Sequence, residues 1–186
     1  MGIKFEHNSY TGPEYEPSVQ IVYSPTSRQT IWASASKAIQ QPSWLYAEGQ
    51  VDQAAVQLPG VGVAIFHIAG NPNSQAARLY SYEVGYRTEL YKRLTVDTSV
   101  FLSDYHHLQT LNPSTPYFTL NPAPPHLVLP NVFGNLGDAR SRGIEASAHW
   151  DATKWWRISP GFSYYQVRLS LPPGSTDASS AASSPK

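Results

Sequence analysis

The sequence predicts an all-β fold, an antiparallel meander of about seven long strands. Three observations predict it. Apolar and polar residues alternate over long windows, which is the signature of strands with two unlike faces. The connections between these windows alternate between tight turns and long excursions. Charged residues make up only 14% of the chain, against about 25% in ordinary soluble domains.

The alternation locates each strand. The even positions from 80 to 90 and from 94 to 102 are mostly apolar or aromatic, and the odd positions are mostly polar, with Phe101 as an exception. Helical spacing fits none of these windows, and several exceed the usual length of about five or six residues. The expected strands cover residues 2–9, 15–24, 29–38, 78–91, 94–109, 140–151 and 155–168.

The connections indicate what kind of sheet this is. Tight turns are expected at 24–28, 91–93 and 151–154, and long excursions at 39–77 and 110–139, with a third opening after Leu169. Short turns on one side and long loops on the other are typical of outer-membrane barrels. Structureless loops of that length are uncommon in compact soluble domains.

The two faces of the strands support the same interpretation. One face carries charges that the dry core of a β-sandwich does not accept unpaired, whereas a wide, wet lumen does. Aromatic residues gather near the strand ends, as at membrane interfaces. The sequence therefore favours a curved segment of a transmembrane β-barrel over a soluble β-sandwich.

This interpretation assigns residues to each face. The residues predicted to face the lumen are Glu83, Arg87, Glu89, Asp97, Glu145, His149 and Arg157. The residues predicted to face lipid are Tyr80, Tyr82, Val84, Tyr86, Leu94, Val96, Val100, Ile144, Ala146, Ala148, Ile158 and Phe162. Too few strands are present to close a wide barrel, so the strands at 2–9 and 155–168 are expected to be unpaired on their outer sides.

Composition excludes several other classes. Thirteen basic and thirteen acidic residues give zero net charge, whereas a nucleic-acid binder should carry a basic patch. Cys is absent, which removes disulfides, thiolate metal sites and cysteine nucleophiles. The longest apolar stretch, about 61–70, is half of the roughly 20 residues that a membrane helix needs. Since the N-terminus has no signal-peptide pattern and residues 169–186 read as an open loop, we expect a fragment of a larger protein.

Three stretches resemble the barrel domain of TonB-dependent outer-membrane receptors. Residues 17–43, with a Ser-Pro-Thr turn followed by Ile-Trp-Ala-Ser-Ala-Ser-Lys-Ala, are similar to a barrel hairpin of that family. The remaining matches are Gly-Asn-Pro-Asn at 70–73, Tyr-Glu-Val-Gly-Tyr-Arg at 82–87, Arg-Leu-Thr-Val-Asp at 93–97, Phe-Leu-Ser-Asp-Tyr at 101–105, Gly-Ile-Glu at 143–145, Trp-Arg at 156–157 and Gly-Phe-Ser-Tyr at 161–164. The chain departs from the family pattern at Lys37 and Gln40, and it ends in Lys186 where an aromatic residue is usual.

The resemblance implies a function for the parent protein. Residues 1–168 would be a partial receptor barrel, and residues 169–186 the Ser/Ala-rich, disordered start of an extracellular loop. The parent would lie in the outer membrane of a Gram-negative bacterium and contact its lipid. It would import a scarce small molecule of the siderophore, cobalamin, saccharide or peptide class. A plug domain outside this chain would couple it to TonB, so no catalytic residue, cofactor or enzyme activity is expected.

The long loops hold the remaining candidates. His106, His107, Tyr117 and His126 are predicted to contact ligand in extracellular loops. A metal site from these histidines and Asp104 is not favoured, because no ligand spacing recurs. No formal charge occurs at 53–77 or at 105–137, which favours neutral or amphipathic ligands. The alternative function is a soluble carbohydrate-binding β-sandwich module of a secreted protein, with Trp and Tyr as stacking platforms.

Overall fold

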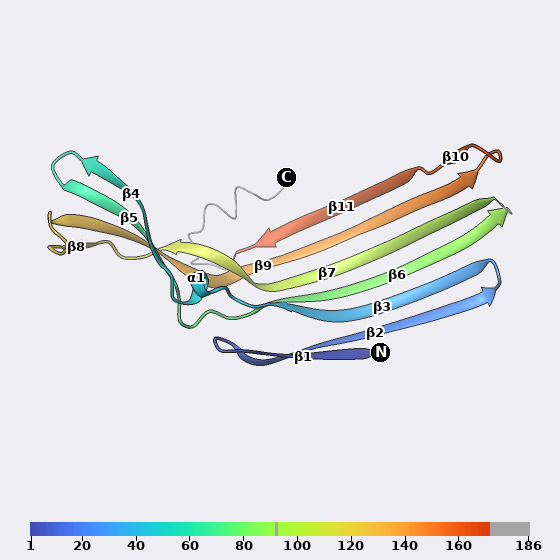
Figure 1. The fold of residues 1–186 in the computed structure, drawn as a ribbon, viewed down its shortest axis with the longest axis horizontal. Helices are drawn as coiled ribbons and strands as arrows, with labels where there is room; N and C mark the ends of the chain where they lie inside the picture. The colour runs from blue at the N-terminus through green and yellow to red at the C-terminus, as the bar shows by residue number, and fades with distance from the viewer. Residues whose placement is uncertain (92, 172–186) are drawn as a thin grey trace.

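The computed structural model describes residues 1–91 and 93–171, which form one eleven-stranded, curved sheet (Figure 1). The strands are β1 (Gly2–Asn8), β2 (Gly12–Thr26), β3 (Gln29–Gln40), β4 (Gln50–Leu58), β5 (Gly62–Ala69), β6 (Ala77–Tyr91), β7 (Leu94–Pro113), β8 (Tyr117–Thr119), β9 (His126–Asp151), β10 (Arg157–Ile158) and β11 (Gly161–Ser170). The single helix of this part of the chain is the one-turn α1 (Trp44–Ala47). No helix within the described ranges has the length and apolar character needed to cross a membrane.

The long strands confirm the predicted meander. The order β1-β2-β3-β6-β7-β9, with β11 on the far side of β9, is antiparallel throughout. Each of the seven expected windows overlaps one of these strands, and 155–168 also contains the short β10. β7 and β9 run further into the predicted excursion at 110–139 than expected, to Pro113 and from His126. Within the described residues β1 pairs only with β2, and β11 only with β9, so the sheet is open as expected. The predicted disordered segment was to begin at Leu169, but β11 continues to Ser170. The rest of that segment, from 172 onward, lies outside the described residues.

The tight turns and the long excursions lie at opposite ends of the strands. Figure 1 shows the β2–β3, β6–β7 and β9–β10 connections together at one end. At the other end lie α1, the β4–β5 hairpin and β8. The sheet therefore has a short-turn end and a long-loop end, as the sequence predicts.

The excursions contain ordered structure that the sequence analysis did not anticipate. A hairpin of β4 and β5 fills much of 39–77, and its turn includes Gly60 at φ +77° and Gly62 at φ +100°. These φ values lie in the left-handed region that glycine adopts without a steric penalty. β5 then pairs in parallel with the first residues of β9, from Val63↔His126 to Ala69↔Val132. This pairing lengthens the sheet beyond the meander at the long-loop end.

A conventional core is confined to the long-loop end. The buried apolar residues of the described chain are Ala47, Ala64, Ile68, Ala76 and Val128. They come from α1, β5, β9 and the segment before β6, and none lies on the long β1–β2–β3 part of the sheet. The described residues form one sheet with no second sheet against it. The β-sandwich alternative requires such a second layer and is therefore not favoured.

Candidate functional site

All seven charged or ionisable residues predicted to face the lumen share one face of the sheet. Residues directly opposite each other in an antiparallel pair point to the same side, and side chains alternate along each strand. Arg87 is opposite Asp97, Asp97 is opposite Ser147, and Arg157 is opposite Asp151. Four further residues lie an even number of positions from these along the same strands and therefore share their side: Glu83, Glu89, Glu145 and His149. We call this side the charged face.

The charged face is hollowed near the short-turn end. A cavity of about 580 Å³ lies between β3, β6, β7, β9 and β11, and its lining includes Arg87, Asp97, Glu145 and His149. Arg87 Nε donates to Asp97 Oδ1 at 2.5 Å. His149 Nδ1 lies 3.1 Å from Ser159 Oγ. Four of the seven predicted residues therefore line one polar cavity.

A further ion pair closes the short-turn end of this face. Arg157 Nε and a second guanidinium nitrogen donate to the two carboxylate oxygens of Asp151, at 2.6 and 3.3 Å. This bidentate hydrogen bond lowers the pKa of the Asp151 carboxyl. The pair joins β10 to the end of β9 beside the turn, which fixes the position of Arg157.

Two aromatic rings on the charged face cover glycines of the neighbouring strand. Trp32 is opposite Gly85, and a Cβ at Gly85 would overlap the indole ring. Phe101 is opposite Gly143, where a Cβ would lie 2.6 Å from Phe101 Cζ and 2.6 Å from the Tyr164 carbonyl oxygen. Phe101, the exception in the sequence pattern, therefore fills the space that Gly143 leaves. The sequence analysis missed this role, although both glycines occur in the family motifs.

At the long-loop end the same face is uncharged and rich in carboxamides. A cavity of about 320 Å³ has five side-chain amides in its lining, from Gln40, Gln41, Gln75, Gln109 and Asn135. Tyr46 of α1 lies beside them. The amides belong to β3, β7, β9 and the segments before α1 and β6, so segments far apart in the sequence build this cavity together. We call it the amide cavity.

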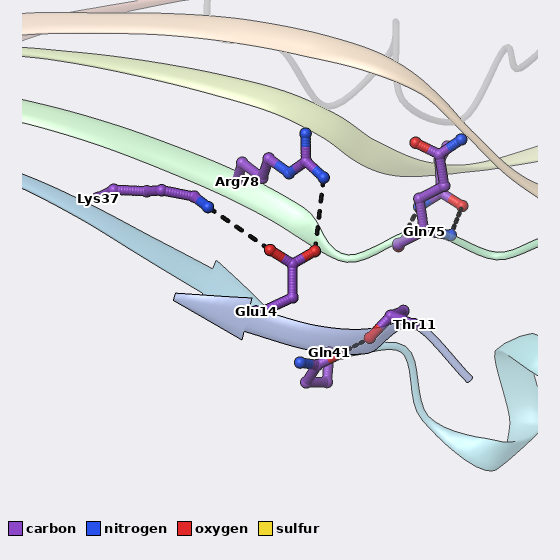
Figure 2. A network of polar contacts seen from close by, with 7 residues as sticks. Thr11, Glu14, Lys37, Gln41, Gln75 and Arg78 are labelled. Atoms are coloured by element: carbon purple, nitrogen blue, oxygen red, sulfur yellow. Dashed lines mark hydrogen bonds and ion pairs between the residues drawn. The ribbon is translucent and has the colours of Figure 1, made fainter. Parts of the chain in front are cut away.

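Hydrogen bonds hold part of the amide cavity in place. Asn135 Nδ2 donates to the backbone carbonyls of Gln75 and His107, both at 3.0 Å. Asn135 Oδ1 accepts a hydrogen bond from the backbone N–H of Gln75 at 2.9 Å. Gln41 Oε1 accepts from Thr11 Oγ1 at 2.5 Å (Figure 2). Gln41 Nε2 is buried and has no partner within the described residues.

The four loop candidates separate into two pairs. His106 and His107 lie at a bulge of β7, where His107 has φ +58° and His106 Nδ1 lies 3.3 Å from Asp138 Oδ1. Tyr117 and His126 lie in the β8–β9 ladder, where Tyr117 is 52% exposed and His126 is buried with Nδ1 2.9 Å from the Pro124 carbonyl oxygen. In residues 1–91 and 93–171 no three His, Asp or Glu side chains come close enough to hold a metal ion.

The opposite face is apolar over most of its length. The twelve residues predicted to face lipid share this side, since Tyr82 is opposite Leu102, Val84 is opposite Val100, and Val100 is opposite Ile144. Many are exposed, including Val84 at 51%, Val100 at 50% and Phe162 at 63%. Exposed apolar area on this scale marks a surface that meets another apolar phase. We call this side the apolar face.

Comparison with known proteins agrees with this geometry. The family model described as TonB dependent receptor-like, beta-barrel, matches residues 1–185. The chain belongs to this family. TonB-dependent receptors are outer-membrane receptors and transporters of Gram-negative bacteria, and the family is not one of enzymes. No curated protein sequence matches the chain.

Solved structures of TonB-dependent receptors share the fold. The siderophore receptor PirA from Acinetobacter baumannii has a TM-score of 0.70 at 17% identity, over 88% of this chain and 24% of that one. A ferric enterobactin receptor (PfeA) mutant from Pseudomonas aeruginosa gives 0.70 at 17%, over 88% and 23%. The FrpB iron transporter from Neisseria meningitidis gives 0.57 at 17%, over 86% and 22%. The chain thus spans about a quarter of the length of these receptors.

Proposed function

We propose that this chain forms part of the barrel wall of an outer-membrane receptor that imports a scarce small molecule by energy-coupled transport. The wall extends to the end of β11 at Ser170, and an extracellular loop follows. The charged face lines the lumen and the apolar face meets lipid. A plug domain elsewhere in the parent protein fills the lumen and passes force from TonB. No covalent step is needed for this function, so the chain supplies binding and a passage rather than catalysis.

The observation that carries the proposal is the pairing of two unlike faces on a single sheet. Large aromatic and β-branched side chains are exposed on one side, and charged side chains, among them the Arg87–Asp97 ion pair, line a hollow on the other. In a membrane barrel these sides meet lipid and water, respectively. The short turns then face the periplasm, and the long-loop end faces the medium.

The amide cavity supports a proposal about ligand chemistry. It lies at the long-loop end of the charged face, where a ligand arriving from the medium would first meet the wall. Its side-chain amides can donate and accept hydrogen bonds without formal charge. A neutral or amphipathic ligand, rich in hydroxyl or amide groups, suits this lining better than a strongly anionic one. Tyr117 is proposed to contact the ligand from β8, and His106 and His107 from the β7 bulge. His126 was predicted to do the same, but it is buried and its Nδ1 lies against the Pro124 carbonyl oxygen, so it is proposed to hold the β8–β9 connection instead.

The test is uptake by cells that express the full-length parent protein. Radiolabelled probes would be a ferric siderophore, cobalamin, a maltooligosaccharide and a tetrapeptide, each with and without a proton-motive-force uncoupler. Accumulation of at least one probe that requires both the protein and an energised membrane is expected. Uptake of a probe that the uncoupler leaves unchanged would indicate a passive pore and contradict the proposal. The absence of protein-dependent uptake of all four classes would contradict it as well.

A further inference from the structure

Three arginines interrupt the apolar face near the long-loop end. Arg140 and Arg142 lie on β9, and Arg168 lies on β11. Arg142 is opposite Leu102 of β7, which places Arg142 on the apolar face. Arg140 lies two residues before it on β9 and therefore points to the same side. Arg168 is opposite Arg140, so it shares this face as well. We call this group the arginine belt. All three residues are exposed.

The belt carries more positive charge than its neighbours balance. Arg140 Nε donates to Asp104 Oδ1 at 2.5 Å. Arg142 donates only to the neutral Gln166 Oε1, at 3.0 Å. Arg168 has no hydrogen bond or ion pair with any described residue. Of the three guanidinium groups, only that of Arg140 has a carboxylate partner among the described residues. Asp138, the next residue of β9 on this face, contacts His106 instead, with 3.3 Å between Oδ1 and Nδ1.

Two other cations on the same side show the contrast. Lys37 and Arg78 both contact the carboxylate of Glu14, at 3.5 and 3.4 Å (Figure 2). Glu14 and Lys37 are nearly buried, with side chains 11% and 9% exposed. Both cations of this cluster therefore have a carboxylate partner within the chain. Arg142 and Arg168 of the arginine belt have no carboxylate partner among the described residues and are exposed.

The arrangement of the belt is unfavourable without an anion. Arg140 and Arg168 are direct cross-strand partners, and like charges directly opposite each other repel. A phosphate between them would replace repulsion by charge-assisted hydrogen bonds, since the guanidinium fork matches phosphate oxygens. The belt is therefore better suited to an anionic ligand than to bare lipid tails.

The height of the belt identifies where that anion would be. Ten residues separate Trp150, near the short turn, from Arg140 along β9, which is about 34 Å of antiparallel strand. Barrel strands tilt by about 35–45°, so this length rises about 24–28 Å, close to the roughly 25 Å height of a barrel's apolar band. The belt thus lies one membrane thickness from the periplasmic side, at the level of the external headgroups.

We infer that the arginine belt binds the phosphate groups of anionic lipids in the external leaflet. The inference rests on the proposed orientation, with the long loops outside. Arg140 and Arg168 hold one phosphate between adjacent strands, and Arg142 extends the site toward the membrane. The bound lipid then offsets the repulsion within the belt and fixes the depth of β9 and β11.

The experiment uses the full-length parent protein in detergent, with diphosphoryl lipid A as the probe and native mass spectrometry as the readout. The variant Arg142→Gln/Arg168→Gln removes two belt charges. Its affinity for the probe is expected to fall roughly 30-fold, from the contribution of each basic residue near an anionic lipid surface. The matched control, Arg28→Gln/Arg93→Gln, removes two arginines at the short-turn end and should bind as the unmodified protein does. The charge-preserving variant Arg142→Lys/Arg168→Lys should retain most of the binding.

Further measurements separate binding from folding and from transport. The thermal unfolding temperature without the probe should not fall in the glutamine variant, because that variant removes a like-charge pair and no ion pair. Dephosphorylated lipid A should bind the unmodified protein and the glutamine variant equally weakly. Equal loss of binding in the control, or undiminished binding in a folded glutamine variant, would overturn the inference. Energy-dependent uptake without belt-dependent lipid binding would refute this inference alone and leave the proposed function intact.

Discussion

The two faces of this sheet use the same backbone but differ in what their side chains require. On the apolar face, Val84, Val100 and Ile144 lie opposite one another with no covering layer among the described residues. On the charged face, three residues from Val84 and Val100 along the same two strands, Arg87 pairs with Asp97 beside a cavity. Both faces are exposed, so burial does not distinguish them. The difference shows that the sequence is patterned for two surroundings rather than for an inside and an outside.

The largest effect should come from placing a charge on the wrong face at the middle of the strands. Val100→Arg replaces an apolar-face residue midway between the Leu94 and Asp104 rows. The expected loss of folding free energy is about 2–4 kcal/mol, the cost of Arg on the lipid side at the bilayer midplane. Urea unfolding of the full-length parent in phosphatidylcholine vesicles measures it.

The matched control is the neighbouring residue on the other face. Ser99→Arg adds the same charge to the charged face beside Glu145, and its effect should stay within about 0.5 kcal/mol. Equal destabilisation by both substitutions would remove the distinction between the faces.

A smaller effect is expected where an aromatic ring covers a glycine on the charged face. Gly143→Ala would bring a Cβ against Phe101 and against the Tyr164 carbonyl oxygen, which belongs to the backbone of β11. Overpacking of this kind costs about 1–3 kcal/mol. The same unfolding measurement applies, with Gly161→Ala as the control because a Cβ there has no atom within 4 Å. Equal folding free energies for Gly143→Ala and Gly161→Ala would show that the packing of Phe101 does not depend on a glycine at position 143.

Much of the meander was predictable because a period of two is a local signal. Alternation at 80–90 and 94–102 reveals the strands. A shift of one residue in register would move every apolar side chain of a strand to the charged face, so the register is strongly specified. The β4–β5 hairpin was harder to see, although Leu-Pro-Gly-Val-Gly at 58–62 is a turn signal between β-branched stretches. Its parallel pairing with β9 joins segments some sixty residues apart. No local pattern specifies such a partner.

The candidate site was predictable to a similar extent. Alternation assigns Arg87 and Asp97 to one face, but only the register makes them direct partners. The amide cavity was missed because its residues come from five separate segments and carry no charge to mark them. The arginine belt was missed for another reason: alternation gives the face of a residue, whereas depth along the membrane normal needs the complete strand lengths. Arg140 and Arg168 became a pair only once β9 and β11 were in register.

The most direct test of the face assignment compares two adjacent positions, Val96 and Asp97, in the full-length parent protein in its membrane. Each is replaced by Cys in turn and treated with a membrane-impermeant maleimide. Asp97→Cys should react much faster, because it lies in the wet hollow of the charged face, whereas a thiol at Val96 would be held protonated against lipid. The opposite order of reaction rates would contradict the assignment and, with it, the barrel-wall interpretation of this chain.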